Sequence, residues 1–392
     1  MSEVFILGGK RTAMGEYAGA LKDVSAIDLG AAAARAAIDA TGVAPEDIDH
    51  AVIGNALQTS GDAIYGARHV ALKAGVPFDR PALTVNRLCG SGIQSVISGA
   101  HMIMLGEAST ALVGGMESMS QAPHVIRGAR SGFALCEGKL EDSLMVALLD
   151  SYSNTPMAGT AENLARKHHI SREEQDAYAL RSQQQAKRAL DAGYFAEEIV
   201  PVEVKTRKGN FSFAADDHLR PDTTIEILAK LRPAFSKDGF VTAGNASGIV
   251  DGAAAIIIAG EQYVKGHNLK PRGRIVSWAY AGVEPEIMGI GPVPATRKAL
   301  EKAGLKLSDI DLVEVNEAFA AQYLAVEQEL GLDRSRTNVN GGAIALGHPL
   351  GATGTRLIIT LLNELHRRGG RYGLATACIG GGQGIAMIVE RV

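Results

Sequence analysis

The sequence predicts an α/β protein made of two similar halves with an inserted lobe between them. Three observations lead to this fold class: apolar runs of strand length alternate with helical patterns, one segment recurs, and the middle of the chain differs in composition. Such alternation is typical of buried strands layered with helices. The strand-like runs lie at residues 4–7, 51–53, 83–85, 111–113, 312–315, 374–377 and 385–389.

A recurring segment indicates the two halves. The helical pattern RAAIDATG ends at Gly42 and is followed by Asp-Ile-Asp and a strand, and RKALEKAG, which ends at Gly304, is followed in the same way. Glycine commonly follows the last turn of a helix. A weaker repeat comes next, because Gly-rich turns that hold Cys89 and His348 each precede a helix. If the halves pack about a pseudo-twofold axis, we expect Cys89 and His348 to face each other.

The residues between the halves have a different character. Residues 119–249 contain fewer strand-like runs, several polar helical patterns such as residues 171–192, and scattered basic residues. We therefore expect an N-terminal half of residues 1–118 with 250–268, an inserted lobe of residues 119–249, and a C-terminal half of residues 269–392.

Composition narrows the classes of function. A net charge of −4 provides no chain-wide basic field for nucleic acid. The longest apolar stretches, such as residues 253–259, are far shorter than the roughly 20 residues that span a bilayer. No signal or Arg- and Ser-rich leader pattern is evident at the N-terminus, so we expect a cytoplasmic protein. Three cysteines without CxxC spacing predict free thiols and no metal site.

Cys89 is the first candidate catalytic residue. The segment NRLCGSG places it at a strand-to-helix turn, where free backbone N–H groups and the helix dipole favour an anion. This setting predicts a stabilised thiolate. The alternative is a cysteine that packs as a small apolar side chain.

Three further segments carry candidate groups. GGAIALGHPLGATG sets His348 before a helix-initiating proline, and imidazole is the usual base for a thiol nucleophile. CIGGGQG places Cys378 before three glycines, which can present N–H groups to an oxyanion or form only a tight turn. NEAFA places Asn316 at a strand's carboxyl end, as a site residue or as a helix cap. His348 could likewise be structural.

These four motifs, in this order, resemble those of the thiolase family, the coenzyme A-dependent acyltransferases that make or cleave 3-oxoacyl thioesters. The resemblance extends from Arg11-Thr12 to the C-terminus. It implies the thiolase fold, with α-β-α-β-α layers, and a homotetramer built as a dimer of dimers. It also implies reversible thiolysis in fatty-acid β-oxidation, with coenzyme A as a substrate and no permanently bound cofactor.

The resemblance also implies residue roles. Cys89 would attack the 3-oxo carbon of the substrate, His348 would deprotonate Cys89, and Cys378 would move the proton of the acetyl-CoA enolate. His348 and Asn316, the latter through a water, would hold one thioester oxygen. The backbone N–H groups of Cys89 and Gly380 would form a second oxyanion hole, and each such donor is typically worth ~3 kcal/mol of barrier.

Coenzyme A contacts are implied in the inserted lobe and beside it. Arg220 would lie near the nucleotide and Ser247 would bond the pantetheine. Phe235, Ala318 and Phe319 would pack along the pantetheine, and Met157 is a further candidate contact of coenzyme A. On sequence grounds alone, Arg220 would be a surface residue and the two phenylalanines would belong to the core.

The acyl chain length depends on a departure from the pattern. Thiolases specialised for acetoacetyl-CoA commonly carry a histidine before the methionine that corresponds to Met157, whereas this chain has Pro156. Proline offers no side-chain donor. The pattern is closer to the mitochondrial-type 3-oxoacyl-CoA thiolases that also accept medium chains.

Three alternative functions remain open at this point. One is a biosynthetic acetoacetyl-CoA thiolase. Another is a decarboxylating ketosynthase-like condensing enzyme, although such enzymes use Cys with two His, or with His and Asn, where this chain has Cys378. The third is a non-catalytic acyl-CoA-binding protein.

Overall fold

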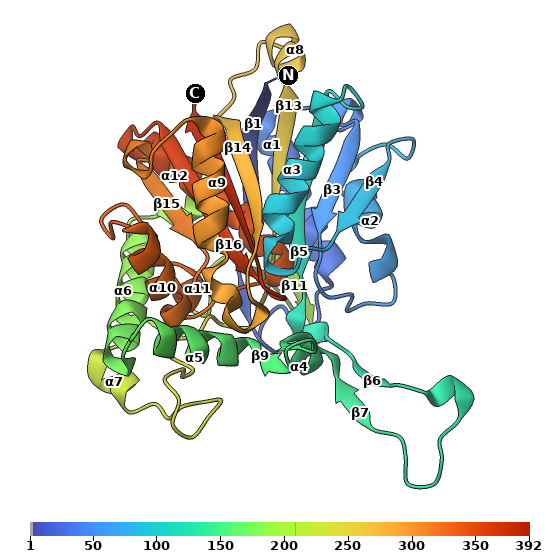
Figure 1. The fold of residues 1–392 in the computed structure, drawn as a ribbon. Coiled ribbons are helices and arrows are strands. Elements are labelled where there is room, and N and C mark those ends of the chain that lie inside the picture. The colour runs from blue at the N-terminus through green and yellow to red at the C-terminus, as the bar shows by residue number, and fades with distance from the viewer. Residues whose placement is uncertain (1–2, 208) are drawn as a thin grey trace.

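The computed structural model describes residues 3–207 and 209–392, and its centre is a large mixed sheet (Figure 1). Within these residues eleven strands form that sheet, nine of them in the order β15-β16-β17-β14-β1-β13-β5-β3-β4. The N-terminal strands are β1 (Val4–Thr12), β3 (His50–Gly54), β4 (Ala82–Val85), β5 (Thr110–Glu117) and β13 (Val250–Gly260). The C-terminal strands are β14 (Gly273–Gly282), β15 (Leu312–Val315), β16 (Tyr372–Ile379) and β17 (Gln383–Arg391).

The two ends of this sheet repeat one pattern. β3 pairs in parallel with β5, and β13 runs antiparallel to β5 and to β1. In the same way, β15 pairs in parallel with β16, and β17 runs antiparallel to β16 and to β14. Between the described residues, β1 of one half pairs with β14 of the other through two residue pairs, Phe5 with Arg274 and Ile6 with Gly273. The predicted two similar halves are therefore confirmed.

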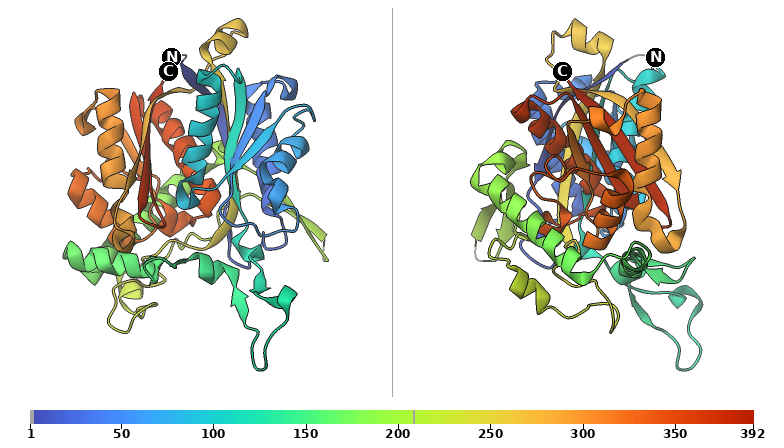
Figure 2. Two further views of the ribbon diagram at one scale, coloured as in Figure 1. Left: turned by 45° about the vertical axis from the view of Figure 1, so that its right-hand side comes forward. Right: turned by 60° about the vertical axis from the view of Figure 1, so that its left-hand side comes forward.

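Helices cover both halves of the sheet and separate them from each other (Figure 2). α1 (Ala26–Thr41) and α2 (Gly66–Lys73) pack on the outer face of the N-terminal strands, and α9 (Pro292–Ala303) packs on β14 and β17. α10 (Ala320–Leu330) packs against α9 on that outer side. α3 (Ser91–Met104) and α12 (Leu350–Arg368) pack on each other between the halves. The result is the expected α-β-α-β-α layering.

The repeated helices begin and end where local chemistry directs. The Ser25 hydroxyl caps α1 by accepting from the Asp28 N–H at 3.1 Å, and α1 ends at Gly42 with φ +68°. α9 begins at Pro292 and ends at Gly304 with φ +66°. Both glycine stops agree with the sequence prediction.

The central helices α3 and α12 approach closely where glycine removes the side chain. A Cβ on Gly92 would lie 2.4 Å from the Thr355 backbone nitrogen, and a Cβ on Gly354 would lie 2.4 Å from the Ile93 backbone nitrogen. Apolar side chains of both helices then join one buried cluster with strands of both halves. The contact fixes the two helices against each other at their N-terminal ends.

The chain between β5 and β13 lies below the sheet as drawn in Figure 1 and runs past both halves. A hairpin, β6 (His124–Ile126) with β7 (Leu140–Asp142), projects away from the body (Figure 2). Buried Arg11 of β1 binds this chain through Glu198 at 2.7 Å and Asp216 at 2.7 and 2.9 Å. Its helices are α4 (Ser143–Ala147), α5 (Met157–Lys167), α6 (Arg172–Asp191) and α7 (Ile225–Ala229).

The remaining elements are short. α8 (Glu261–Gly266) follows β13, and α11 (Ala343–Leu346) precedes α12. The short strands are β2 (Gly15–Glu16), β8 (Leu149–Asp150), β9 (Thr155–Pro156), β10 (Ile199–Val200), β11 (Val202–Thr206) and β12 (Gly209–Phe213).

Candidate active site

Cys89 and His348 occupy equivalent places at the starts of the two central helices. Cys89 lies in a 3-10 turn, Leu88–Gly90, directly before α3, and His348 lies two residues before α12. Leu88 has a φ of +47°, an uncommon conformation for a residue with a side chain. The Asn86 side chain stabilises this turn by accepting from the Leu88 N–H at 2.9 Å. The correspondence expected from the weaker repeat is confirmed.

The hydrogen bonds of His348 define its neutral tautomer. The Thr353 hydroxyl donates to the Pro349 carbonyl at 3.0 Å, so at 2.6 Å from His348 Nδ1 it accepts the Nδ1 proton. The Nε2 atom then carries the lone pair, and the Asn316 Nδ2 group lies 3.3 Å from it. Burial, with a smaller effect of the Arg356 charge, lowers the pKa of His348 to about 3. His348 is therefore neutral, with its free lone pair on Nε2.

The predicted thiolate at Cys89 is wrong for the free protein. Burial, with a smaller contribution from the charge of Glu117, raises the pKa of the Cys89 thiol to about 11. The backbone N–H groups of Gly380 and of Cys89 itself act in the opposite direction, as the helix start was expected to do. Desolvation outweighs them, so Cys89 is a thiol in the free protein.

Cys378 lies beside Cys89 in a fully buried position at the end of β16. Burial raises its pKa, and the nearby Cys89 raises it further. The three glycines after it form a tight turn in which Gly381 and Gly382 have φ of +78° and +80°. A Cβ on Gly382 would lie 2.3 Å from the Val283 carbonyl oxygen. This turn directs the Gly380 N–H toward the Cys89 sulfur.

A cavity of about 190 Å³ opens onto His348 and brings together several predicted coenzyme A contacts. Met157, Phe235, Ser247 and Phe319 all line it. Cys89 packs in one cluster with Met119, Leu350 and Ile249, which line the same cavity. Pro156 lies on its wall together with the apolar side chains Met145, Leu148 and Leu149.

Ala318 has a different role from the one predicted for it. It is buried, it packs with Cys378 and Met288, and its carbonyl accepts from the Ser247 N–H at 3.0 Å. It does not line the cavity in the part of the chain that the structure describes. It supports Ser247 through the backbone.

Arg220 lies in a second cavity of about 480 Å³, lined also by Glu16, Gln183 and His218. Its guanidinium forms an ion pair with Glu16, and its backbone N–H donates to the Gln183 side chain at 2.9 Å. The side chain is half exposed, so the sequence-based reading of a surface arginine also fits.

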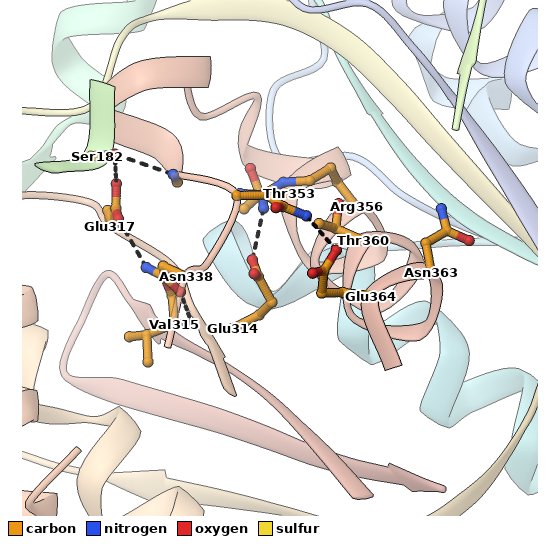
Figure 3. Close-up of polar contacts among 12 residues, drawn as sticks. Ser182, Glu314, Val315, Glu317, Asn338, Thr353, Arg356, Thr360, Asn363 and Glu364 are labelled. Carbon is orange, nitrogen blue, oxygen red and sulfur yellow. Dashed lines mark hydrogen bonds and ion pairs between the residues drawn. The ribbon is translucent and has the colours of Figure 1, made fainter. Parts of the chain in front are cut away.

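Sequence reasoning missed Glu317, although it follows Asn316 directly. The buried carboxylate accepts from the Tyr178 hydroxyl at 2.6 Å, the Ser182 hydroxyl at 2.7 Å, the Asn338 side chain at 2.9 Å and the Ile344 N–H at 3.2 Å. Figure 3 shows Glu317 between Ser182 and Asn338. It connects helix α6 with the segment that leads to His348. A charged residue directly after a buried strand was the available signal.

Arg356 and Glu314 form a buried ion pair near His348. The Arg356 guanidinium donates to Glu314 at 3.1 Å (Figure 3). Among the described residues, its Nε and Nη2 atoms have no hydrogen-bond partner. Its positive charge disfavours protonation of His348. Arg356 was another residue that the motifs did not single out.

Comparisons with known proteins agree with this geometry. The family models for the thiolase N-terminal and C-terminal domains match residues 4–262 and 269–391. The mitochondrial 3-ketoacyl-CoA thiolase of Homo sapiens is 60% identical over 388 residues, 99% of this chain and 98% of the relative. An acetyl-CoA acetyltransferase of Chromobacterium violaceum is 51% identical over 391 residues, 99% of this chain and 100% of the relative.

A solved structure is similarly close. The crystal structure of human mitochondrial 3-ketoacyl-CoA thiolase in complex with CoA superposes with a TM-score of 0.97 at 58% identity, covering 100% of this chain and 98% of that chain.

The expected cytoplasmic location is wrong. The relatives from Homo sapiens, Pongo abelii and Bos taurus, at 58–60% identity, are named as mitochondrial, which points to the mitochondrion. The expectation rested only on the missing leader pattern, and such an absence does not establish a location. Within the described residues, no helix combines the length and hydropathy needed to cross a membrane.

The family models cover nearly all of the chain, and a relative of 60% identity spans the same length. The chain therefore belongs to the thiolase family of acyltransferases.

Proposed function

We propose that the chain catalyses the reversible thiolytic cleavage of 3-oxoacyl-CoA by coenzyme A, giving acetyl-CoA and a shortened acyl-CoA. The cleavage of acetoacetyl-CoA to two acetyl-CoA is included. One observation carries the proposal: two thiols, Cys89 and Cys378, lie side by side where the Gly380 N–H reaches Cys89. The neutral His348 lines the cavity beside these two thiols. The names of the human and Chromobacterium relatives support the same reaction.

The first half-reaction forms an acyl-enzyme. His348 Nε2 takes the Cys89 proton as the sulfur attacks the 3-oxo carbon. The bond between C2 and C3 then breaks, the acyl group stays on Cys89, and the acetyl-CoA enolate takes a proton from Cys378. The protonated Nε2 and Asn316, acting through a water, stabilise the oxygen of one thioester. The free base at Nε2 and the raised pKa of the Cys378 thiol suit these roles.

The second half-reaction transfers the acyl group to coenzyme A. Cys378, now a thiolate, takes the proton of the coenzyme A thiol as its sulfur attacks the acyl carbon. The Cys89 sulfur leaves and recovers its proton from His348 Nε2. The N–H groups of Cys89 and Gly380 hold the oxygen that becomes negative in this step, and each such donor is typically worth ~3 kcal/mol. In the synthetic direction, Cys378 removes the α-proton of a second acetyl-CoA.

We further propose that residues 119–249, with the loops beside them, bind coenzyme A as a substrate. Ser247, Phe235, Phe319 and Met157 line the cavity at His348 and would contact the pantetheine. Arg220, in the neighbouring cavity, would contact the nucleotide. The human relative solved in complex with CoA supports this assignment. The chemistry above uses only groups of the chain and the substrates, so we propose no permanently bound cofactor.

Medium-chain substrates and a role in fatty-acid β-oxidation complete the proposal. Pro156 offers no donor, and the Met145, Leu148 and Leu149 side chains beside it form an apolar wall suited to an acyl tail. We also propose a homotetramer built as a dimer of dimers. The projecting hairpin supports this, since its Ile126, Leu135 and Leu140 side chains are exposed.

The activity is tested by mixing the protein with coenzyme A and acetoacetyl-CoA, then with 3-oxohexanoyl- and 3-oxooctanoyl-CoA, while following the loss of enolate absorbance. Turnover of any of them supports the proposal, and turnover of none refutes it. Cys378→Ala should still take label from acetyl-CoA at Cys89 but fail to exchange the α-proton. Cys89→Ala should take no label.

A further inference from the structure

We propose that Glu117 is a positioning residue for this reaction, whose buried carboxylate fixes both the wall behind Cys89 and the helix that carries His348. The inference rests on the proposed function, because it takes Cys89 as the nucleophile. Glu117 ends β5 in the N-terminal half and is fully buried.

Four N–H groups converge on the Glu117 carboxylate. Oε1 accepts from Asn55 Nδ2 at 2.7 Å and from the Leu57 N–H at 2.9 Å. Oε2 accepts from the Ala56 N–H at 3.0 Å and from the Gly351 N–H at 2.8 Å. All four donors are neutral, and no Lys, Arg or His among the described residues forms an ion pair with Glu117. These donors favour the anionic form of the carboxylate through their dipoles and offset part of the cost of its burial.

Each donor belongs to a segment that borders the nucleophile. Ala56 and Leu57 pack in the same apolar cluster as Cys89. The Ala56 carbonyl also accepts from the Asn86 side chain at 3.1 Å, and Asn86 begins the turn that carries Cys89. The Glu117 carboxylate is therefore hydrogen-bonded directly to the segment beside Cys89. It is linked to the turn that carries Cys89 indirectly, through Ala56 and Asn86.

The fourth donor, the Gly351 N–H, belongs to the C-terminal half. Gly351 lies in the first turn of α12, three residues after His348. β5 meets this turn with backbone against backbone, since a Cβ on Gly115 would lie 1.8 Å from the Gly351 carbonyl oxygen. The carboxylate thus spans the boundary between the halves, and the segments that hold Cys89 and His348 share one anchor.

The carboxylate also acts on Cys89 by its charge. A negative charge nearby disfavours the thiolate, and Glu117 contributes to the raised pKa of Cys89. The other titratable groups at this place are Cys378, a thiol, and His348, which is neutral. Burial, with a smaller contribution from Asp251 of β13, raises the pKa of Glu117 to about 7, although the three backbone N–H donors act in the opposite direction. Replacing Glu117 by a neutral group therefore lowers the pKa of Cys89.

The test is Glu117→Gln in the full-length protein. The amide NH₂ must face two N–H donors, so the segments shift, and we expect kcat for acetoacetyl-CoA thiolysis to fall about 10- to 100-fold. KM for coenzyme A should stay within about twofold, because Glu117 lines neither cavity. The pH midpoint of Cys89 alkylation by iodoacetamide should fall by about half a unit or more. A role confined to overall stability would leave that midpoint unchanged.

The matched control is Glu390→Gln, another largely buried glutamate, at the far end of β17, where it binds Arg274 and Arg371. It should keep the wild-type kcat and alkylation midpoint. A Glu117→Gln variant with kcat within twofold of wild type, or with an unchanged midpoint, overturns the inference.

Asn55→Ala covers the case in which Glu117→Gln does not fold. It removes one of the four donors, and we expect kcat to fall about threefold to tenfold with KM for coenzyme A unchanged. An unchanged kcat overturns the inference. Wild-type protein that turns over no 3-oxoacyl-CoA would instead refute the proposed function, while the alkylation midpoint still tests the action of Glu117 on Cys89.

Discussion

Replacing Thr353 with valine should impair His348 as a base, although His348 itself is not substituted. The hydroxyl of Thr353 accepts the Nδ1 proton of His348 at 2.6 Å and passes its own proton to the Pro349 carbonyl. Valine has nearly the same shape and no acceptor. In Thr353→Val the buried imidazole either keeps an Nδ1 proton without a partner or moves that proton to Nε2, where it removes the lone pair that Cys89 needs.

The size of the effect follows from burial. Both Thr353 and His348 are buried, and a buried donor left without a partner costs about 1–3 kcal/mol. This cost is the free energy by which the variant favours the tautomer with the proton on Nε2, which cannot act as the base. Since each 1.4 kcal/mol is a factor of ten, kcat should fall about 5- to 150-fold. KM for coenzyme A should change little, because Thr353 lines neither cavity.

The assay is steady-state thiolysis of acetoacetyl-CoA, with urea unfolding to measure stability. Thr360→Val is the matched control. Thr360 is a buried threonine seven residues after Thr353 on the same helix, and its hydroxyl donates to Glu198 at 3.0 Å. It should lose similar stability and keep kcat within about twofold. If Thr353→Val keeps the kcat of Thr360→Val, the assignment of the tautomer is refuted.

Three further predictions concern the thiol, the buried carboxylate beside Asn316 and the outer cavity. In Cys378→Ala, the rate of Cys89 alkylation should rise about tenfold per pH unit between about pH 7 and pH 10, because a pKa of about 11 keeps the Cys89 thiol protonated in this range. The rate is measured from the mass of the peptide that contains Cys89. A rate that does not change with pH would indicate that the thiolate is already formed. Glu317→Gln should lower the free energy of unfolding by about 2–4 kcal/mol, since at least one charge-assisted hydrogen bond is lost; urea unfolding measures it, and an unchanged midpoint contradicts the network. Arg220→Ala should raise KM for coenzyme A several-fold at constant kcat, and a fall in kcat alone would argue against a nucleotide contact.

The repeat in the sequence was sufficient to predict the frame of the site. Two helices that stop at Gly42 and Gly304 identified the halves, and the turns that follow placed Cys89 and His348 at matching helix starts. These are local features, since a glycine stop and a helix start can be recognised from neighbouring residues. Packing the halves then brought the two turns to one place.

Features that depend on the surroundings of a group were not predictable in this way. The thiolate expected at Cys89 reflected only the helix start, whereas burial by residues from several elements decides its protonation. Thr353, Glu117 and Glu317 act through partners that are distant in the chain or that take effect only once His348 is buried. Nothing in their own sequence neighbourhoods indicates those contacts.

The close approach of α3 and α12 at Gly92 and Gly354 has a mechanical consequence. Because main chain meets main chain there, the spacing between the nucleophile and its base is set by two stiff rods in contact. A single methyl group at Gly92 would collide with the Thr355 backbone and force the starts of the two helices, and with them Cys89 and His348, apart.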